Sequence, residues 1–119
     1  MDAGNVSPSM PSPLIASLEK LVGTPRDGAL LRYSLGTEYL KAGDAGRGIA
    51  SLREAVARDP QYSAAWKALG RALAEAGRDE EALAAFASGI EAARARGDKQ
   101  AGKEMAVFAR RLEKKPGAR

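Results

Sequence analysis

The sequence of 119 residues contains no cysteine and no histidine, and aromatic residues make up only 5% of it. Without cysteine there are no disulfides and no thiolate ligands, and without histidine the commonest metal ligand and general base are both missing. No apolar run approaches the roughly 18 residues of a membrane span, and the first residues lack the basic and apolar regions of a signal peptide. We therefore expect a cytoplasmic protein, with no membrane contact, that uses no metal or cofactor.

Catalytic candidates are also few. Asp79, Glu80 and Glu81 form one acidic cluster, but they stand where a helix is expected to begin, and the helix dipole favours negative charge there. No nucleophile stands beside a recognisable base. The sequence predicts no catalytic residue, and hence a protein that is not an enzyme.

Apolar residues make up 45% of the chain and charged residues 29%, which is typical of one globular domain. Alanine, the best helix former, occurs 25 times, and the β-branched residues that favour strands are scarce. The composition predicts an all-α fold.

A short motif recurs at a spacing of 34 residues. Leu35-Gly36 returns as Leu69-Gly70, and the turn glycine Gly43 returns as Gly77 in the same register. The same shift pairs Tyr39 with Leu73, Gly48 with Ala82, Leu52 with Phe86 and Ala55 with Gly89. Self-similarity at such a period indicates a helical repeat.

These residues resemble the tetratricopeptide repeat (TPR) family, whose pattern is a large residue, Leu-Gly, an aromatic, Ala, a large apolar residue and Pro. The first copy supplies Leu35, Gly36, Tyr39, Leu52 and Pro60, and the second supplies Trp66, Leu69, Gly70, Ala82 and Phe86. The copies depart from the pattern at Arg32, Gly48, Leu73 and Arg94. The resemblance covers about residues 23–114. It implies a TPR-like α-solenoid of two full repeats, flanked by an N-terminal half-repeat helix and a C-terminal capping helix.

The helices are expected at about 12–22, 26–42, 45–58, 62–76, 79–96 and 98–114, within one domain of residues 12–114. Residues 1–11 and 115–119 are expected to be disordered tails, because they cannot bury enough apolar area to offset ordering. Ser12, Asp44, Asp79 and Asp98 are the expected N-caps. Gly43 and Gly77 should end their helices in the left-handed conformation.

Packing expectations follow from the repeat. Gly36, Gly48, Gly70 and Ala82 should mark close helix crossings, and Phe86 should lie in the core between its own helix pair and the last helix. The helix at 26–42 should be apolar on two sides, with Leu31, Leu35 and Tyr39 on one side and Leu30, Tyr33 and Leu40 on the other. The last helix should turn Met105, Val107, Phe108 and Leu112 inward.

The resemblance also implies a function. Family members bind peptides or partner proteins in a concave groove lined by the first helix of each pair, as adaptors and assembly factors. Carried over by position, the groove here would be lined by Leu30, Tyr33, Thr37, Leu40, Lys67, Arg71, Met105 and Phe108. This apolar, basic, apolar order favours a ligand with an acidic centre and apolar flanks. The Lys and Asn residues with which one subclass grips a C-terminal carboxylate are absent.

Two other functions remain open. The chain could be a self-associating structural module, a monomer or weak homodimer, since two repeats leave apolar ends. It could also bind nucleic acid through its basic end, because residues from Arg94 onward include nine basic and three acidic side chains. That reading is the weaker, because Phe108 is the one aromatic residue after Arg94 and base stacking uses aromatics. The sequence does not identify the partner.

Overall fold

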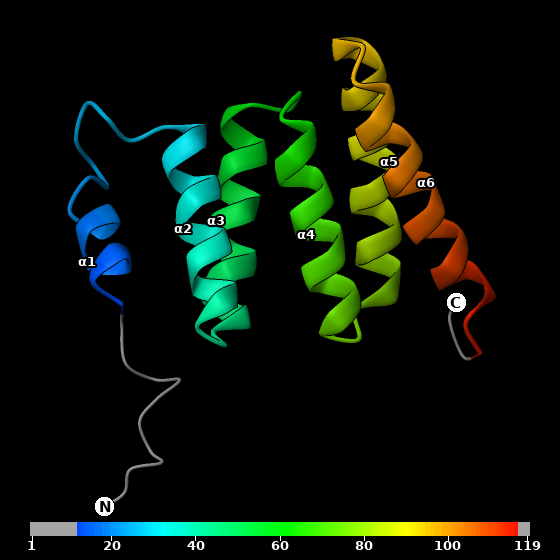
Figure 1. Cartoon of the computed structure of the whole chain (residues 1–119), viewed down its shortest axis with the longest axis horizontal. Coiled ribbons are helices and arrows are strands. Elements are labelled where there is room, and N and C mark those ends of the chain that lie inside the picture. The colour runs from blue at the N-terminus through cyan, green and yellow to red at the C-terminus, as the bar shows by residue number, and fades with distance from the viewer. Residues whose placement is uncertain (1–11, 117–119) are drawn as a thin grey trace, which may run out of the picture.

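The computed structural model describes residues 12–116. These residues form six helices and no strand. The helices are α1 (Pro13–Glu19), α2 (Ala29–Lys41), α3 (Ala45–Arg58), α4 (Ser63–Glu75), α5 (Asp79–Arg96) and α6 (Lys99–Lys114). They stand side by side in chain order, and successive helices run in opposite directions from α2 onward (Figure 1). The predicted tail at 1–11 lies outside the described residues, and so do residues 117–119 of the tail predicted at 115–119.

Most helix ends match the signals in the sequence. The Ser12 hydroxyl accepts a hydrogen bond from the Ile15 N–H at 3.0 Å, with Pro13 in the first helical position. Gly43 and Gly77 have φ angles of 83° and 79°, the left-handed conformation that glycine adopts without a Cβ penalty. Just beyond each of them, the next N–H bonds back to a carbonyl of the helix, which satisfies that orphan acceptor.

One predicted helix start and one predicted N-cap are wrong. Helix α2 begins at Ala29 and not near residue 26, because a turn precedes it: the Asp27 N–H donates to the Thr24 carbonyl, and the Asp27 carboxylate accepts from the Gly23 N–H. Asp79 is not an N-cap; Arg78 occupies that position and Asp79 is the first helical residue. The carboxylate of Asp79 instead pairs with Lys115 at 3.2 Å, which ties residue 115 to the start of α5.

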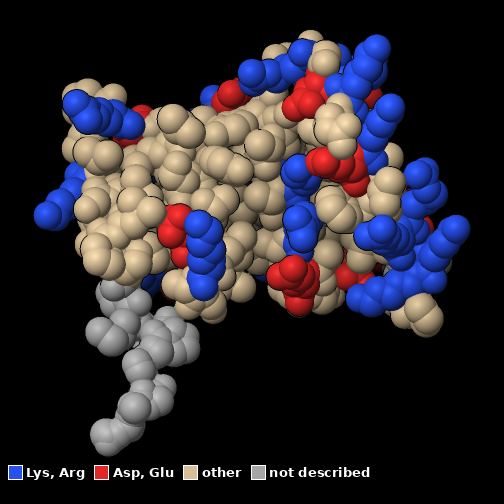
Figure 2. Space-filling view, in the orientation of Figure 1, with Lys and Arg blue, Asp and Glu red and all other residues tan. Residues whose placement is uncertain are grey.

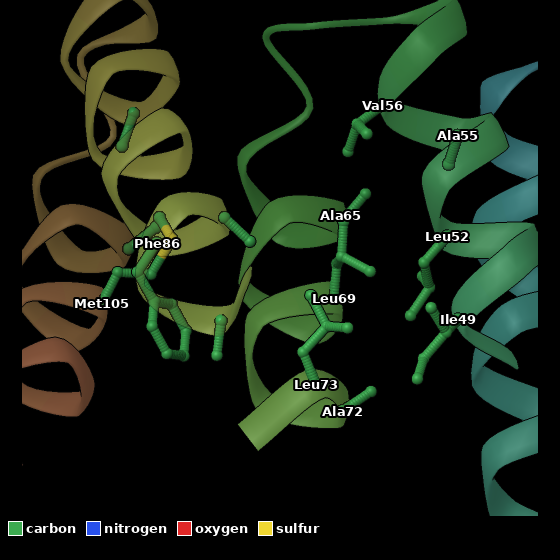
Figure 3. Packing of buried hydrophobic residues seen from close by; sticks show 14 of the residues in the cluster. Ile49, Leu52, Ala55, Val56, Ala65, Leu69, Ala72, Leu73, Phe86 and Met105 are labelled. Carbon is green, nitrogen blue, oxygen red and sulfur yellow. The ribbon is translucent and has the colours of Figure 1, made fainter. Parts of the chain in front are cut away.

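The core has two parts. The larger one joins α3, α4, α5 and α6, and includes Leu52, Leu69, Leu73, Phe86 and Met105 (Figure 3). The smaller one holds α1 against α2, as the half-repeat reading predicted, through Ile15, Leu31, Leu35 and Tyr39. The Tyr39 hydroxyl also donates a hydrogen bond to the Glu19 carboxylate at the end of α1. The first helix is therefore an integral part of the stack.

Glycines let the paired helices approach closely, as predicted. A Cβ on Gly36 would lie 2.7 Å from the Leu52 side chain, and one on Gly48 would lie 2.7 Å from Leu40. In the second repeat a Cβ on Gly70 would overlap the ring of Phe86, which is 1% exposed. Each of these distances is shorter than a normal carbon contact of about 3.5–4.0 Å. The two helix pairs can therefore cross only where these positions carry no side chain.

The stack is curved. The backbones of α2 and α4, and of α4 and α6, approach closely. Within residues 12–116 the backbones of α3 and α5 do not, and these two helices meet through the long side chains of Arg53 and Glu81, whose guanidinium and carboxylate lie 2.6 Å apart. Alternate helices that touch on one side and separate on the other give a concave and a convex face. The concave face belongs to α2, α4 and α6, which stand toward the viewer in Figure 1, with α2 in front of α3 and α6 in front of α5.

The last helix is out of register with the repeat. Helices α2 and α4 start 34 residues apart, but α4 and α6 start 36 residues apart, at Ser63 and Lys99. The cause is α5, which has 18 residues where α3 has 14 and is followed by a shorter connection. Each residue turns a helix by about 100°, so two extra residues turn it by about 200°. The shift moves the expected groove residues of α6 toward the core.

Candidate functional site on the concave face

The groove positions of α2, namely Leu30, Tyr33, Thr37 and Leu40, carry no charge. Leu30 is 68% exposed, although the sequence placed it on a packed side of the helix. The ring of Tyr33 packs against that of Tyr62, with centroids 5.0 Å apart. Burial raises the pKa of Tyr62 above its ordinary value, so the phenol is neutral at physiological pH. Exposed aliphatic and aromatic surface at this end can therefore bind apolar side chains.

A hollow of about 390 Å³ opens beside Leu30. It lies at the end where α2, α4 and α6 begin, and Ser63 in its wall donates a hydrogen bond to the Asp98 carboxylate at 3.0 Å. Its lining residues are Ala29, Leu30, Asp59, Tyr62, Ser63, Ala64, Arg96 and Asp98. This volume is enough for one large side chain of a ligand.

Thr37 and Leu40 extend the same uncharged strip toward the end of α2. The Thr37 hydroxyl donates to the Ser34 carbonyl at 3.0 Å, so it is partly satisfied within its own helix. Leu40 is half-buried, because its side chain fills the space above Gly48. Both residues therefore offer a ligand a limited, mainly apolar contact.

In the middle of the face, the charge of Lys67 is already balanced. Its Nζ lies 2.6 Å from Glu104 Oε1 on α6, and the Gln100 amide donates to the other oxygen at 3.0 Å. The hydrogen bond from Gln100 and, with a smaller effect, that from Lys67 hold the pKa of Glu104 below its ordinary value. Lys67 therefore joins α4 to α6 and is less available to a ligand than the sequence suggested.

Arg71 is the available cation on α4. Its guanidinium lies 5.0 Å from the centre of the Phe108 ring, a cation–π contact, and Phe108 in turn stacks on Phe86. Within residues 12–116, no carboxylate forms an ion pair with Arg71. A second hollow, of about 210 Å³, adjoins it and is lined by Arg71, Ala74, Glu75, Phe86, Phe108 and Leu112. A cation above an apolar hollow can bind a carboxylate with a neighbouring apolar group.

Two predictions for α6 are wrong. Met105 is fully buried, which confirms that it points inward but means that it cannot line a groove. It fills the space left by Gly89, whose missing Cβ would also meet Trp66 at 2.7 Å. Val107, predicted to point inward, is 38% exposed. With the 36-residue spacing, Met105 corresponds to the core residue Leu69 and Val107 corresponds to Arg71. Phe108 keeps a place in the site, half-buried beneath Arg71.

The same spacing identifies groove residues that sequence reasoning missed. Lys103, Val107 and Arg110 stand 36 residues after Lys67, Arg71 and Ala74, and all three are exposed. They lie opposite the buried side of α6, which Ala101, Met105 and Leu112 form. The signal was available, because a helix expected at 79–96 followed by an N-cap at Asp98 already implies the longer spacing.

Charge therefore changes across the concave face. Figure 2 shows a broad uncharged area over α2 and toward α4, and Lys and Arg side chains gathered over α6. Acidic side chains lie between the basic ones around α4 and α6, where Glu104 pairs with Lys67. The order is apolar, mixed and basic, and not the apolar, basic, apolar order predicted from the sequence.

Residues 12–116 contain no group of three or more acidic side chains placed to hold a metal ion. None of the helices α1 to α6 is long and apolar enough to span a bilayer.

Antiparallel helix pairs stacked around close glycine crossings, with alternate helices on a concave face, define a TPR-like helical solenoid. A sequence model of the tetratricopeptide repeat matches residues 33–99, which is more than half of the chain. The chain belongs to the tetratricopeptide repeat family, and this membership indicates a protein–protein interaction module.

Relatives agree with this assignment. A TPR repeat-containing protein of Pseudomonas aeruginosa is 48% identical over 101 residues, which cover 85% of this chain and 96% of that protein. A Bordetella parapertussis protein of known solution structure is 39% identical with a TM-score of 0.72, and the match covers 86% of this chain and 89% of that one. A tetratricopeptide repeat domain protein of Salinibacter ruber is 31% identical with a TM-score of 0.68, over 73% and 97% of the two chains.

Proposed function

We propose that the protein is a non-catalytic adaptor of the bacterial cytoplasm that binds a peptide or an extended segment of a partner protein on its concave face. The observation that carries the proposal is Arg71, whose guanidinium lies over Phe108 beside an apolar hollow and forms no ion pair within residues 12–116. Desolvating a guanidinium is costly unless it gains a partner, so an acidic ligand group is the natural complement.

The α2 end supplies the apolar part of the site. Leu30 is a large aliphatic side chain held in water at the edge of a hollow, next to the Tyr33–Tyr62 pair. Covering such a side chain contributes roughly 1.5–3 kcal/mol. A ligand that covers Leu30 and reaches Arg71 gains both an apolar and an ionic contact, and this supports a peptide with mixed apolar and acidic character.

The test is selection of binding peptides from a random dodecapeptide library displayed on phage, followed by fluorescence anisotropy with the selected peptides. Leu30→Asp and Arg71→Gln should each weaken binding by about tenfold, because each removes roughly 1.5 kcal/mol of contact. Arg94→Gln is the matched control, since Arg94 is an exposed arginine on the convex helix α5.

The control should bind as the unaltered protein does. If all three variants bind the selected peptides equally well, the peptides do not occupy the concave face and the proposal is wrong. If no sequence is enriched and light scattering gives a stable dimer that Leu30→Asp dissociates, the chain is a self-associating module instead.

A further inference from the structure

We infer that the ligand crosses the concave face in one polarity, with its apolar part on α2 and a block of acidic residues on α6. This inference rests on the proposed function, and it adds the chemistry and spacing of the partner segment. It depends on the 36-residue spacing between α4 and α6, which places Lys103 and Arg110 on the concave face.

The cations of α6 are unusually free to interact. The helix carries five basic residues, Lys99, Lys103, Arg110, Arg111 and Lys114, and two acidic ones, Glu104 and Glu113. Glu104 is taken by Lys67 and Gln100. Within residues 12–116, Lys103 and Arg110 form no ion pair, whereas exposed arginines of α3 and α5 such as Arg47 and Arg94 pair with their own helices.

The opposite end of the face gives an acidic block little attraction. The hollow beside Leu30 is lined by Asp59 and Asp98, and the cation in its lining, Arg96, lies 3.9 Å from the Asp59 carboxylate. The groove positions of α2 are Leu30, Tyr33, Thr37 and Leu40, and the charged residues of α2 are already paired: Arg32 with Asp27, and Lys41 with Glu38. Salt screens the electrostatic attraction of the α6 cations within roughly 10 Å under physiological conditions, and this is about the distance between neighbouring helices. An acidic block therefore gains energy over α6 and little over α2, which fixes the direction of binding.

An acidic protein segment fits this face better than a nucleic acid does. Phe108, the aromatic residue of α6, is half-buried and contacts both Arg71 and Phe86, which leaves little of its ring for stacking on a base. Between Lys103 and Arg110 stands Val107, an exposed aliphatic side chain that suits an apolar side chain among acidic ones. A peptide can supply both acidic and aliphatic side chains, whereas a nucleic acid has no aliphatic side chains.

The helix spacing sets the length of the segment. Packed helices lie about 8–10 Å apart, so α2 and α6 are separated by roughly 20 Å across α4. An extended peptide advances about 3.3 Å per residue. The apolar and acidic parts of the ligand should therefore stand about six residues apart.

The dodecapeptide selection tests this inference directly. Enriched sequences should carry an apolar block and an acidic block about six positions apart. In anisotropy at low salt, the Lys103→Gln/Arg110→Gln variant should bind an enriched peptide about five- to tenfold more weakly, with a shallower dependence on NaCl. The control Arg47→Gln/Arg94→Gln has the same net charge and should bind normally.

Failure of the inference can be told from failure of the proposed function. If Leu30→Asp and Arg71→Gln weaken binding but Lys103→Gln/Arg110→Gln does not, the concave face binds peptides without the proposed polarity. If none of these variants weakens binding, both statements are wrong. Competition by an oligouridine probe, abolished by Lys103→Gln/Arg110→Gln, would assign these cations to nucleic acid and overturn the inference.

Discussion

Substituting Gly70 tests the helix crossing on which the repeat depends. In Gly70→Ala the new Cβ would lie 2.6 Å from Phe86 Cδ1 and 2.8 Å from Phe86 Cζ, and it would overlap Cε1 as well. The ring cannot swing aside easily, because it is fully buried and stacked on Phe108 at 5.8 Å. The added methyl must therefore push the two helices apart or force the ring out of its preferred rotamer.

Two opposing effects decide the size of the change. Replacing glycine by alanine inside a helix contributes about 1 kcal/mol of stability through backbone entropy. Overpacking a tight core costs about 1–3 kcal/mol, and the overlap with three ring carbons favours the upper part of that range. We expect Gly70→Ala to lower the free energy of unfolding by about 1–2 kcal/mol, which lowers Tm by roughly 5–10 °C for a domain of this size.

Gly102→Ala is the matched control. A Cβ on Gly102, also inside a helix, would lie 3.6 Å from the Ala93 Cβ, an ordinary contact. This variant should gain close to the full 1 kcal/mol of helix propensity, and its Tm should rise. Circular-dichroism melts of both variants make the comparison. Equal stabilisation by the two substitutions would refute the close crossing at Gly70.

A double-mutant cycle locates the cause. Phe86→Leu removes the ring atoms that the new methyl would meet, so Gly70→Ala should cost less in the Phe86→Leu background than in the unaltered protein. The coupling should amount to about 1 kcal/mol or more, since the residues are in direct contact. Additive effects would mean that the strain, if any, lies elsewhere.

Three further predictions concern stability. Phe86→Ala should lower the free energy of unfolding by about 3–5 kcal/mol, enough to leave much of the protein unfolded; an unchanged thermal melt would contradict the core position of this ring. Asp98→Ala should cost about 1 kcal/mol in urea titrations, because the carboxylate accepts from the Ala101 N–H at 3.1 Å as the N-cap of α6; Asp98→Asn should retain most of that stability. Hydrogen bonds from Arg32 and from the Gly23 N–H hold the pKa of Asp27 well below its ordinary value, so the contribution of this carboxylate to stability is present above about pH 4 and lost as pH falls further. The Tm difference between Asp27→Asn and the unaltered protein should shrink over that acid range, and a pH-independent difference would contradict this account.

The sequence predicted much of this fold because its strongest signals are local. Helix α3 runs over the predicted residues 45–58 and α5 over 79–96, since Gly43 and Gly77 fix where the preceding helices end. The pairing of Leu35-Gly36 with Leu69-Gly70 predicted the crossings for a physical reason: only glycine leaves room for Leu52 or Phe86.

The candidate site was harder to predict, because the side of a helix that faces the groove depends on the register of that helix and not on residue type. A uniform 34-residue period carried into α6 placed Met105 in the groove and Val107 in the core. Because α5 is longer than α3, α6 is rotated relative to that period, so Met105 lies in the core and Val107 is exposed. The pairing of Lys67 with Glu104 was also beyond the sequence, since the two residues are 37 positions apart in the chain. Ion pairs between distant helices follow from packing that no local pattern records.

The most direct test of concave-face binding is NMR titration of the 15N-labelled protein with an enriched dodecapeptide. Shift changes should concentrate on α2, α4 and α6, at residues such as Leu30, Arg71 and Val107. Amides on the outer sides of α3 and α5, such as those of Ala57 and Glu91, should not move. Changes centred on α3 and α5 with α2 and α6 unaffected would contradict the proposal that this protein binds its partner on the concave face.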